Sequence, residues 1–152
     1  MGLNIQDLKI SSPSFEDGGP LDDKHANDRD NVPPGLKITG VPDGTRELAV
    51  ICHDPDAPLP FGFTHWTLYN IAPDTTDIGA DADEKFSAGP NDFGATGYGG
   101  PQPPDGHGTH RYYFWVYALD TTVSGTPARK EFLEQYGENI VEQNRVVGTY
   151  ER

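Results

Sequence analysis

Two runs of aromatic and β-branched residues decide the fold predicted for this chain: THWTLYNI at residues 64–71 and RYYFWVYALD at residues 111–120. Residues of these types are enriched in strands because their side chains pack well on a pleated sheet. Shorter runs at Asn4–Ser11, Leu36–Thr39 and Glu47–Cys52 are further strand candidates, and the 18 Gly and 14 Pro residues lie between the runs as turn and loop residues. The pattern predicts a mainly β domain.

Helix signals occur only near the C-terminus. Thr126 is suited to capping a helix and Pro127 to its first position, so a helix is predicted over Ala128–Tyr136. A short second helix over Glu138–Gln143 is predicted to follow it. The apolar residues from Val146 to Tyr150 then predict a final strand or an extended tail packed on the body of the domain.

Residues 72–109 show little periodicity and consist largely of Gly, Pro and Asp with isolated aromatic residues. A long segment without secondary structure in a compact domain is usually functional. The aromatic residues Phe86, Phe93 and Tyr98 indicate that the segment packs on the body. We therefore expect an ordered loop system that forms one wall of a pocket.

The composition predicts one domain, residues 1–152, with a strongly acidic surface. The length is sufficient for a core, and 24 acidic against 11 basic residues give a net charge of -13. Such a surface repels nucleic acid and anionic membranes, so neither is expected as a partner. Because salt screens self-repulsion, the composition also fits adaptation to a salty cytoplasm.

The single cysteine, Cys52, lies in an apolar run, so it is expected to be a buried structural thiol without a disulfide partner in the chain. The N-terminal residues lack the charged and apolar regions of a signal peptide. No apolar run approaches the length of a membrane span. A cytoplasmic location is the resulting expectation.

Two polar stretches at the ends of strand candidates predict a functional site: HDPDAP at residues 53–58 and GHGTHRY at residues 106–112. Strands feeding polar loops commonly position functional groups. Alternation along a strand puts His110 and Tyr112 on one face of a sheet, and it puts His65 on the same face as Thr67 and Tyr69. If the three strands are neighbours, two imidazoles, the carboxylates after residue 53 and a phenol meet at one sheet edge.

This group of side chains suits a small anion. An imidazole near a carboxylate has its charged form favoured, so His65 and His110 are expected to supply positive charge. Tyr112 can donate a hydrogen bond, and the Gly-rich backbone at residues 99–102 can add amide donors. Asp54 and Asp56 would orient the imidazoles, since bare carboxylates repel phosphate.

Three other interpretations of the same residues stay open. The pair His107 and His110 has loose metal-ligand spacing, but no helix is predicted beneath it. A hydrolase of a small ester or phosphoester, with a histidine as base, is the enzymatic alternative, although no known nucleophile motif is present. The residues can also be simple strand-end fixtures, with Asp54 and Asp56 satisfying loop amides. The prediction is a binding protein without catalytic activity, metal or other cofactor.

At these positions the chain resembles the phosphatidylethanolamine-binding protein family, and within it the prokaryotic branch described as Raf-kinase-inhibitor-like. The stretches that match occur in the family's order along nearly the whole chain: DPDAP (54–58), HWTLYNI (65–71), PPDG (103–106), HRYYF (110–114) and VGTY (147–150).

The resemblance implies a β-sandwich with a large antiparallel sheet, a smaller sheet and short C-terminal helices. It also implies a pocket for phosphate-like or acetate-like groups and, from the bacterial relatives, a homodimer. A regulatory protein of the kinase-inhibitor kind, which holds a phosphorylated partner, is the corresponding alternative function. Carried over by matching positions, the pocket residues are Asp54, Asp56, His65, Gly100, Gln102, His110 and Tyr112.

Overall fold

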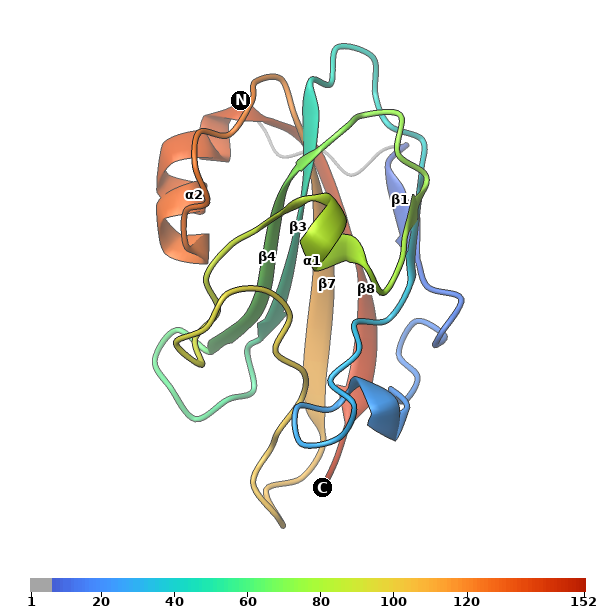
Figure 1. The fold of residues 1–152 in the computed structure, drawn as a ribbon, viewed down its shortest axis with the longest axis vertical. Coiled ribbons are helices and arrows are strands. Elements are labelled where there is room, and N and C mark those ends of the chain that lie inside the picture. Colours follow the sequence, from blue (N-terminus) through green and yellow to red (C-terminus); the bar gives the residue numbers. More distant parts are fainter. Residues whose placement is uncertain (1–6) are drawn as a thin grey trace.

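The computed structural model describes residues 7–152 as two antiparallel sheets that share one core (Figure 1). The larger sheet has five strands in the order β6 (Ser87–Ala88), β4 (Phe63–Ile71), β3 (Glu47–Asp54), β7 (His110–Leu119) and β8 (Ile140–Tyr150). The smaller sheet has three, in the order β1 (Lys9–Ser11), β2 (Leu36–Thr39) and β5 (Asp77–Ile78). The predicted mainly β architecture with a large and a small sheet is confirmed.

The main core fills the space between the two sheets. Leu48, Trp66 and Phe114 from the larger sheet belong to one buried cluster with Leu36 and Ile38 from the smaller sheet. Apolar side chains that alternate along strands of both sheets interdigitate in this way in β-sandwiches. The shared core fixes how the strands of the larger sheet present their ends to solvent.

The opposite face of the larger sheet is covered by α2 (Arg129–Tyr136). Ala49, Ile51 and Tyr69 on this face cluster with Phe132 of the helix, which has no exposed surface. All eight residues of β3 are buried, because core lies on both of its sides. Burial on both faces explains why residues 48–52 of the strand are all apolar rather than alternating with polar residues.

Helix prediction at the C-terminus was partly wrong. Helix α2 was predicted, but it begins at Arg129, and its N-cap residue Ala128 makes no side-chain capping bond, so the expected cap at Thr126 is not found. The predicted helix Glu138–Gln143 is wrong, because only a 3-10 turn, η2 (Gly137–Asn139), precedes β8. Pairing along the whole of β7 outweighs the weak helix preference of so short a segment.

The predicted loop system at residues 72–109 is ordered and packs on the sheet. It contains only β5, β6 and the short helix α1 (Ala82–Lys85), and a second 3-10 turn, η1 (Asp23–His25), lies elsewhere. Asp83 of α1 fastens the loops, since its carboxylate accepts from Trp66 Nε1 at 2.7 Å and from the Tyr98 amide at 2.8 Å. The loops therefore have fixed positions beside the sheet.

The remaining strand predictions hold with small changes of boundary. Of the strand predicted over residues 4–11, residues 4–6 lie outside the described part of the chain, and among residues 7–11 the strand spans Lys9–Ser11. Cys52 is buried, and burial raises its pKa, as expected for a structural thiol. Within residues 7–152, no helix has both the length and the apolar character needed to cross a membrane.

Candidate functional site

The ends of three adjacent strands meet at one edge of the larger sheet. Strand β3 lies between β4 and β7 and runs antiparallel to both. Its last residue, Asp54, therefore lies beside the first residues of its two neighbours, near His65 and His110. The predicted adjacency of the three strands is confirmed, and it gathers side chains that are far apart in sequence.

A pocket of about 240 Å³ opens at this edge. The strand ends form its floor, and the loops at residues 57–59 and 102–104 form two of its walls. The residues that line it are Asp54, Ala57, Pro58, Leu59, Phe63, His65, Phe93, Gln102, Pro103, Pro104, His110 and Tyr112. Apolar and aromatic side chains therefore make up most of the walls, with a few polar groups at the floor, which is typical of small-ligand sites.

A register shift in β4 directs His65 into this pocket. Cys52 pairs with Trp66, whereas the next residue of β3, His53, pairs with Thr64, so His65 is the extra residue of a bulge. A bulge re-aims side chains relative to the regular alternation. His65 consequently contacts the Tyr112 ring, with 5.1 Å between ring centroids. The expectation that His65 shares a face with Tyr69 was wrong, because Tyr69 packs under α2 on the other side of the sheet.

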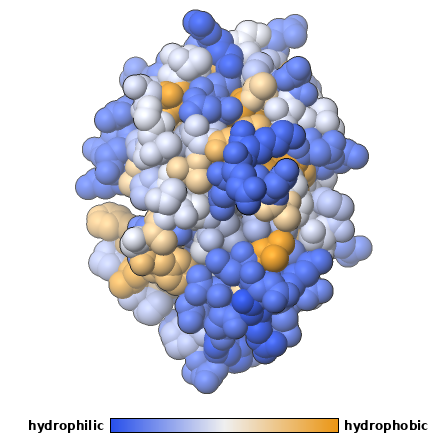
Figure 2. Space-filling view, viewed as in Figure 1, coloured by the Kyte–Doolittle hydropathy of each residue, from blue (hydrophilic) through white to orange (hydrophobic). Residues whose placement is uncertain are grey.

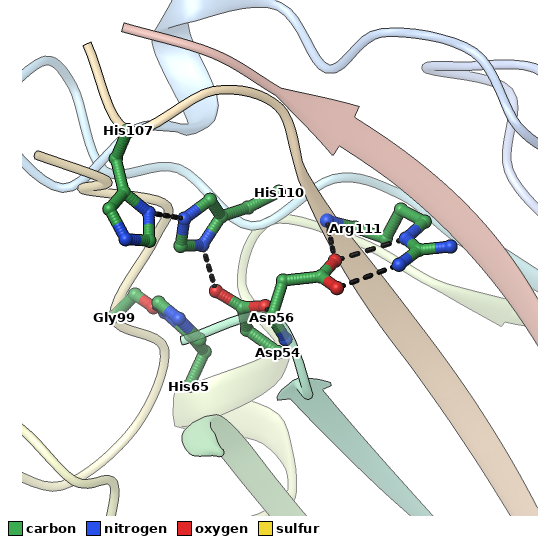
Figure 3. A network of polar contacts seen from close by, with 7 residues as sticks. All are labelled: Asp54, Asp56, His65, Gly99, His107, His110 and Arg111. Atoms are coloured by element: carbon green, nitrogen blue, oxygen red, sulfur yellow. Dashed lines mark hydrogen bonds and ion pairs between the residues drawn. The ribbon is translucent and has the colours of Figure 1, made fainter. Parts of the chain in front are cut away.

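A chain of hydrogen bonds connects Asp54 through His110 to the loop residue His107 (Figure 3). Asp54 Oδ2 lies 2.6 Å from His110 Nδ1, and both side chains are almost completely buried. Asp54 Oδ1 accepts the Asp56 amide at 2.7 Å, so the carboxylate is held at both oxygens. An ionised carboxylate only accepts, so Nδ1 of His110 carries a proton. Asp54 thus holds the His110 ring through Nδ1.

The other ring nitrogen of His110 faces His107. Its Nε2 lies 2.6 Å from Nδ1 of His107, an exposed residue of the turn that precedes β7. One proton lies between these two nitrogens. It is bound either to Nδ1 of a neutral His107 or to Nε2 of a cationic His110. This direct contact leaves no room for a metal ion between the rings. In the described part of the chain, no group of three or more His, Cys, Asp or Glu residues could hold a metal ion.

His65 differs from the expectation that it supplies positive charge. Its Nδ1 donates to the Gly99 carbonyl oxygen at 2.7 Å. Burial lowers the pKa of the ring, and only 4% of the residue is exposed. A neutral ring with its proton on Nδ1 presents an unprotonated Nε2, so His65 is a hydrogen-bond acceptor at neutral pH.

Tyr112 is the clearest donor in the pocket. Burial raises the pKa of its phenol, and the charge of Asp54 raises it further. The hydroxyl therefore keeps its proton at every physiological pH. Tyr112 shares a sheet face with His110, as predicted, and the two rings stack at 6.4 Å between centroids.

Asp56 was expected in the pocket wall, but it is not among the lining residues. Its carboxylate forms a double contact with the Arg111 guanidinium, at 2.7 and 3.0 Å, and it also accepts the Arg111 amide at 2.8 Å. The guanidinium holds the pKa of Asp56 below its usual value. The pair joins the loop after β3 to the start of β7 outside the pocket, so Asp56 supports the site only indirectly (Figure 3).

The two predicted residues of the Gly-rich rim lie in different environments. Gln102 lines the pocket. Gly100 does not, and its amide donates to Asn31 Oδ1 at 2.8 Å, so this amide is not available to an anion. A Cβ at position 100 would collide with the His25 carbonyl oxygen, which explains the glycine.

Sequence reasoning missed the aromatic and proline residues that shape the pocket. Phe63 and Phe93 meet edge to face at 4.7 Å between centroids, and each also contacts the His65 ring. Phe93 was recognised only as an aromatic residue that packs its loop. His107 was considered only with His110 as a loose metal-ligand pair, and not as a hydrogen-bond partner of His110. Its position three residues before His110, next to two glycines, is the signal that could have identified it.

The chain is similar to a known protein family along nearly its whole length. The sequence profile described as phosphatidylethanolamine-binding protein matches residues 11–151. The UPF0098 protein of Archaeoglobus fulgidus is 38% identical over 146 residues, which cover 91% of this chain and 50% of that protein, so the chain spans half the length of this relative. The UPF0098 protein YbhB of Escherichia coli is 39% identical over 125 residues, covering 74% of this chain and 78% of YbhB.

A solved structure has the same fold over nearly the whole chain. The crystal structure of Escherichia coli YbcL, described as a new member of the mammalian PEBP family, superimposes with a TM-score of 0.89 at 29% sequence identity. The superposition covers 97% of this chain and 99% of YbcL.

Proposed function

Because this chain belongs to the phosphatidylethanolamine-binding protein family, in its YbhB/YbcL-type branch, we propose that its pocket binds a small anionic or phosphorylated group. The observation that carries the proposal is the hydrogen-bond chain from Asp54 through His110 to His107 at the edge of the pocket. A carboxylate beside a buried imidazole favours the charged form of the ring, and a positive charge at the edge of the pocket attracts an anion.

Binding of the anion is coupled to protonation in this proposal. The pocket holds the Asp54 carboxylate and a neutral His65, so a second negative charge enters unfavourably unless a proton enters with it. The contact between His110 and His107 is the place where that proton is accommodated. Tyr112 then donates to the anion, and the aromatic walls exclude water around it. Affinity for an anion of constant charge should therefore increase as the pH falls.

Calorimetric titration with sulfate and phosphate between pH 8 and pH 6 tests this proposal. Sulfate is the reference because phosphate itself gains a proton in this range. We expect sulfate affinity to increase by up to about tenfold per pH unit, the limit for uptake of one proton. His110→Gln should abolish this increase, and Tyr112→Phe should weaken binding at every pH. His53→Gln is the matched control, since His53 is a buried histidine of the same sheet edge that does not line the pocket.

A second set of titrations decides whether the pocket recognises an amine instead of an anion. Asp54 and the rings of Phe63, Phe93 and Tyr112 would also suit an ammonium group. Titrations with ethanolamine and phosphoethanolamine separate the two ends of such a ligand. Binding of ethanolamine with no binding of sulfate or phosphate would refute the anion proposal, as would unchanged sulfate affinity in His110→Gln.

Two further expectations belong to the same proposal. We propose a cytoplasmic location and a homodimer, because the family resemblance implied the latter. The oligomeric state is measured by light scattering at several protein concentrations, and a monomer at all of them would remove the dimer from the proposal.

A further inference from the structure

A second hollow, which we call the groove, is larger than the anion pocket and lies on the other side of the loop at residues 55–62. It runs between this loop and α2 and encloses about 690 Å³, a volume in the range of small-ligand sites. Leu59 lines both hollows and separates them. Neither His65, His110 nor Tyr112 lines this groove, so whatever it binds does not use the pocket proposed above.

Large apolar side chains are exposed to solvent on the loop side of the groove. Phe61 is 83% exposed and Leu59 is 53% exposed, and with Phe93 they are the exposed large hydrophobic residues in the described part of the chain. Figure 2 shows this loop as a pale orange patch at the lower left, below the position that α2 has in Figure 1. Clustered exposed apolar side chains commonly mark a binding surface. Pro60 and Leu133 extend the apolar lining on either side.

The helix side of the groove supplies a cation without a partner. Arg129, the first residue of α2, lines the groove, and its Nε is one of two buried side-chain nitrogen or oxygen atoms in the described residues that lack a hydrogen bond. Arg129 forms no ion pair within 4.0 Å among these residues. Its side chain is partly exposed, so a molecule in the groove can reach the guanidinium. Buried polar atoms are nearly always satisfied, so this exception marks Arg129 as a cation whose hydrogen bonds the described residues do not supply.

The surrounding charges limit what that ligand can be. A second cation, Lys130, and three carboxylates also line the groove: those of Asp92, Glu131 and Glu134. The Asp92 carboxylate already accepts the Thr64 amide at 2.7 Å. These carboxylates and the overall charge of -13 disfavour a polyanion such as a nucleotide or a nucleic acid. A single carboxylate matches the planar fork of a guanidinium. The apolar lining suits a hydrocarbon body attached to that carboxylate.

We propose that this groove is a second binding site, for a small amphiphilic monocarboxylate. Arg129 binds the carboxylate, and Leu59, Phe61 and Leu133 cover the apolar body. The site is independent of the anion pocket, because the two share only Leu59.

Titration of the intact chain with octanoate tests the proposal. Wild type should bind octanoate, and Arg129→Gln should bind it about tenfold to a hundredfold more weakly, the usual effect of removing a charged hydrogen-bond donor. Phe61→Ser should also weaken binding. The variant should fold normally, because the Phe61 side chain is mostly exposed. His110→Gln should leave octanoate affinity unchanged, and Arg129→Gln should leave sulfate affinity unchanged. Thermal unfolding of each variant confirms that it is folded.

Several results would overturn the proposal. Absence of octanoate binding to wild type, or equal affinity in Arg129→Gln, removes the carboxylate contact. Equal affinity for octanol or octylammonium shows that only apolar surface is recognised. A wild-type dimer that dissociates in Phe61→Ser shows that a second copy of the chain covers the groove instead.

Discussion

His53 should make the fold less stable in acid by an amount that the structure allows us to calculate. Its ring contacts Thr64 Oγ1 at 3.1 Å, and 7% of the residue is exposed. Burial, and next the charge of Arg129, lower its pKa from 6.5 to about 4. The folded state therefore keeps His53 neutral at pH values where the unfolded chain would already have protonated it.

The direction follows from this difference in bound protons. Well above pH 6.5 the ring is neutral in both the folded and the unfolded state, so His53 does not make the free energy of unfolding depend on pH there. As the pH falls from 6.5 towards 4, the unfolded state gains a proton that the folded state does not, so the free energy of unfolding decreases. With these pKa values, lowering the pH from 7 to 5 costs about 2 kcal/mol, which is a large part of the stability of an ordinary small domain.

Urea unfolding at pH 7 and pH 5, on wild type and on His53→Gln, measures this cost. Other buried groups titrate in the same window: His65 acts in the same direction, whereas the raised pKa of Glu47 acts in the opposite one. Both remain in the variant, so they cancel when the two pH dependences are subtracted. Wild type should lose about 2 kcal/mol more than the variant between the two pH values.

Equal losses in the two proteins would refute the reasoning. So would an NMR titration in which the His53 ring protonates near 6.5. Because Arg129 contributes to the lowered pKa, Arg129→Gln should raise the pKa of His53 in the same NMR experiment. The outcome also sets the lowest pH at which anion binding can be measured on folded protein.

Three further predictions concern stability. Phe132→Ala should lower the free energy of unfolding by about 3–5 kcal/mol in urea, because this fully buried ring packs against Tyr69 and holds α2 on the sheet; a loss below about 1 kcal/mol would contradict that packing. Gly100→Ala should lower the melting temperature, since its Cβ would collide with the His25 carbonyl oxygen, whereas Gly137→Ala, with open space at its Cβ, should not. Molar KCl should raise the melting temperature, because it screens a net charge of -13, and no stabilisation would argue against adaptation to high salt.

The larger sheet was predictable because its strands are encoded locally. The runs at residues 64–71 and 111–120 are aromatic and β-branched, and both form strands within one or two residues of the predicted limits. The same stretches place His65 and His110 at strand starts, so their meeting at one edge needed only the correct neighbours for β3. Strand β8 was harder, because the segment from residue 138 has weak helix signals and becomes a strand only through pairing with β7.

The sequence by itself determined which residues stand at the strand ends, because side-chain alternation and turn residues act over a few positions. Only the tertiary structure decided what each of them touches. A one-residue bulge directs His65 into the pocket, and the ion pair with Arg111 holds Asp56 outside it. The turn before β7 places His107 in contact with His110. These outcomes depend on strand register and on contacts between distant segments, and no local pattern records either.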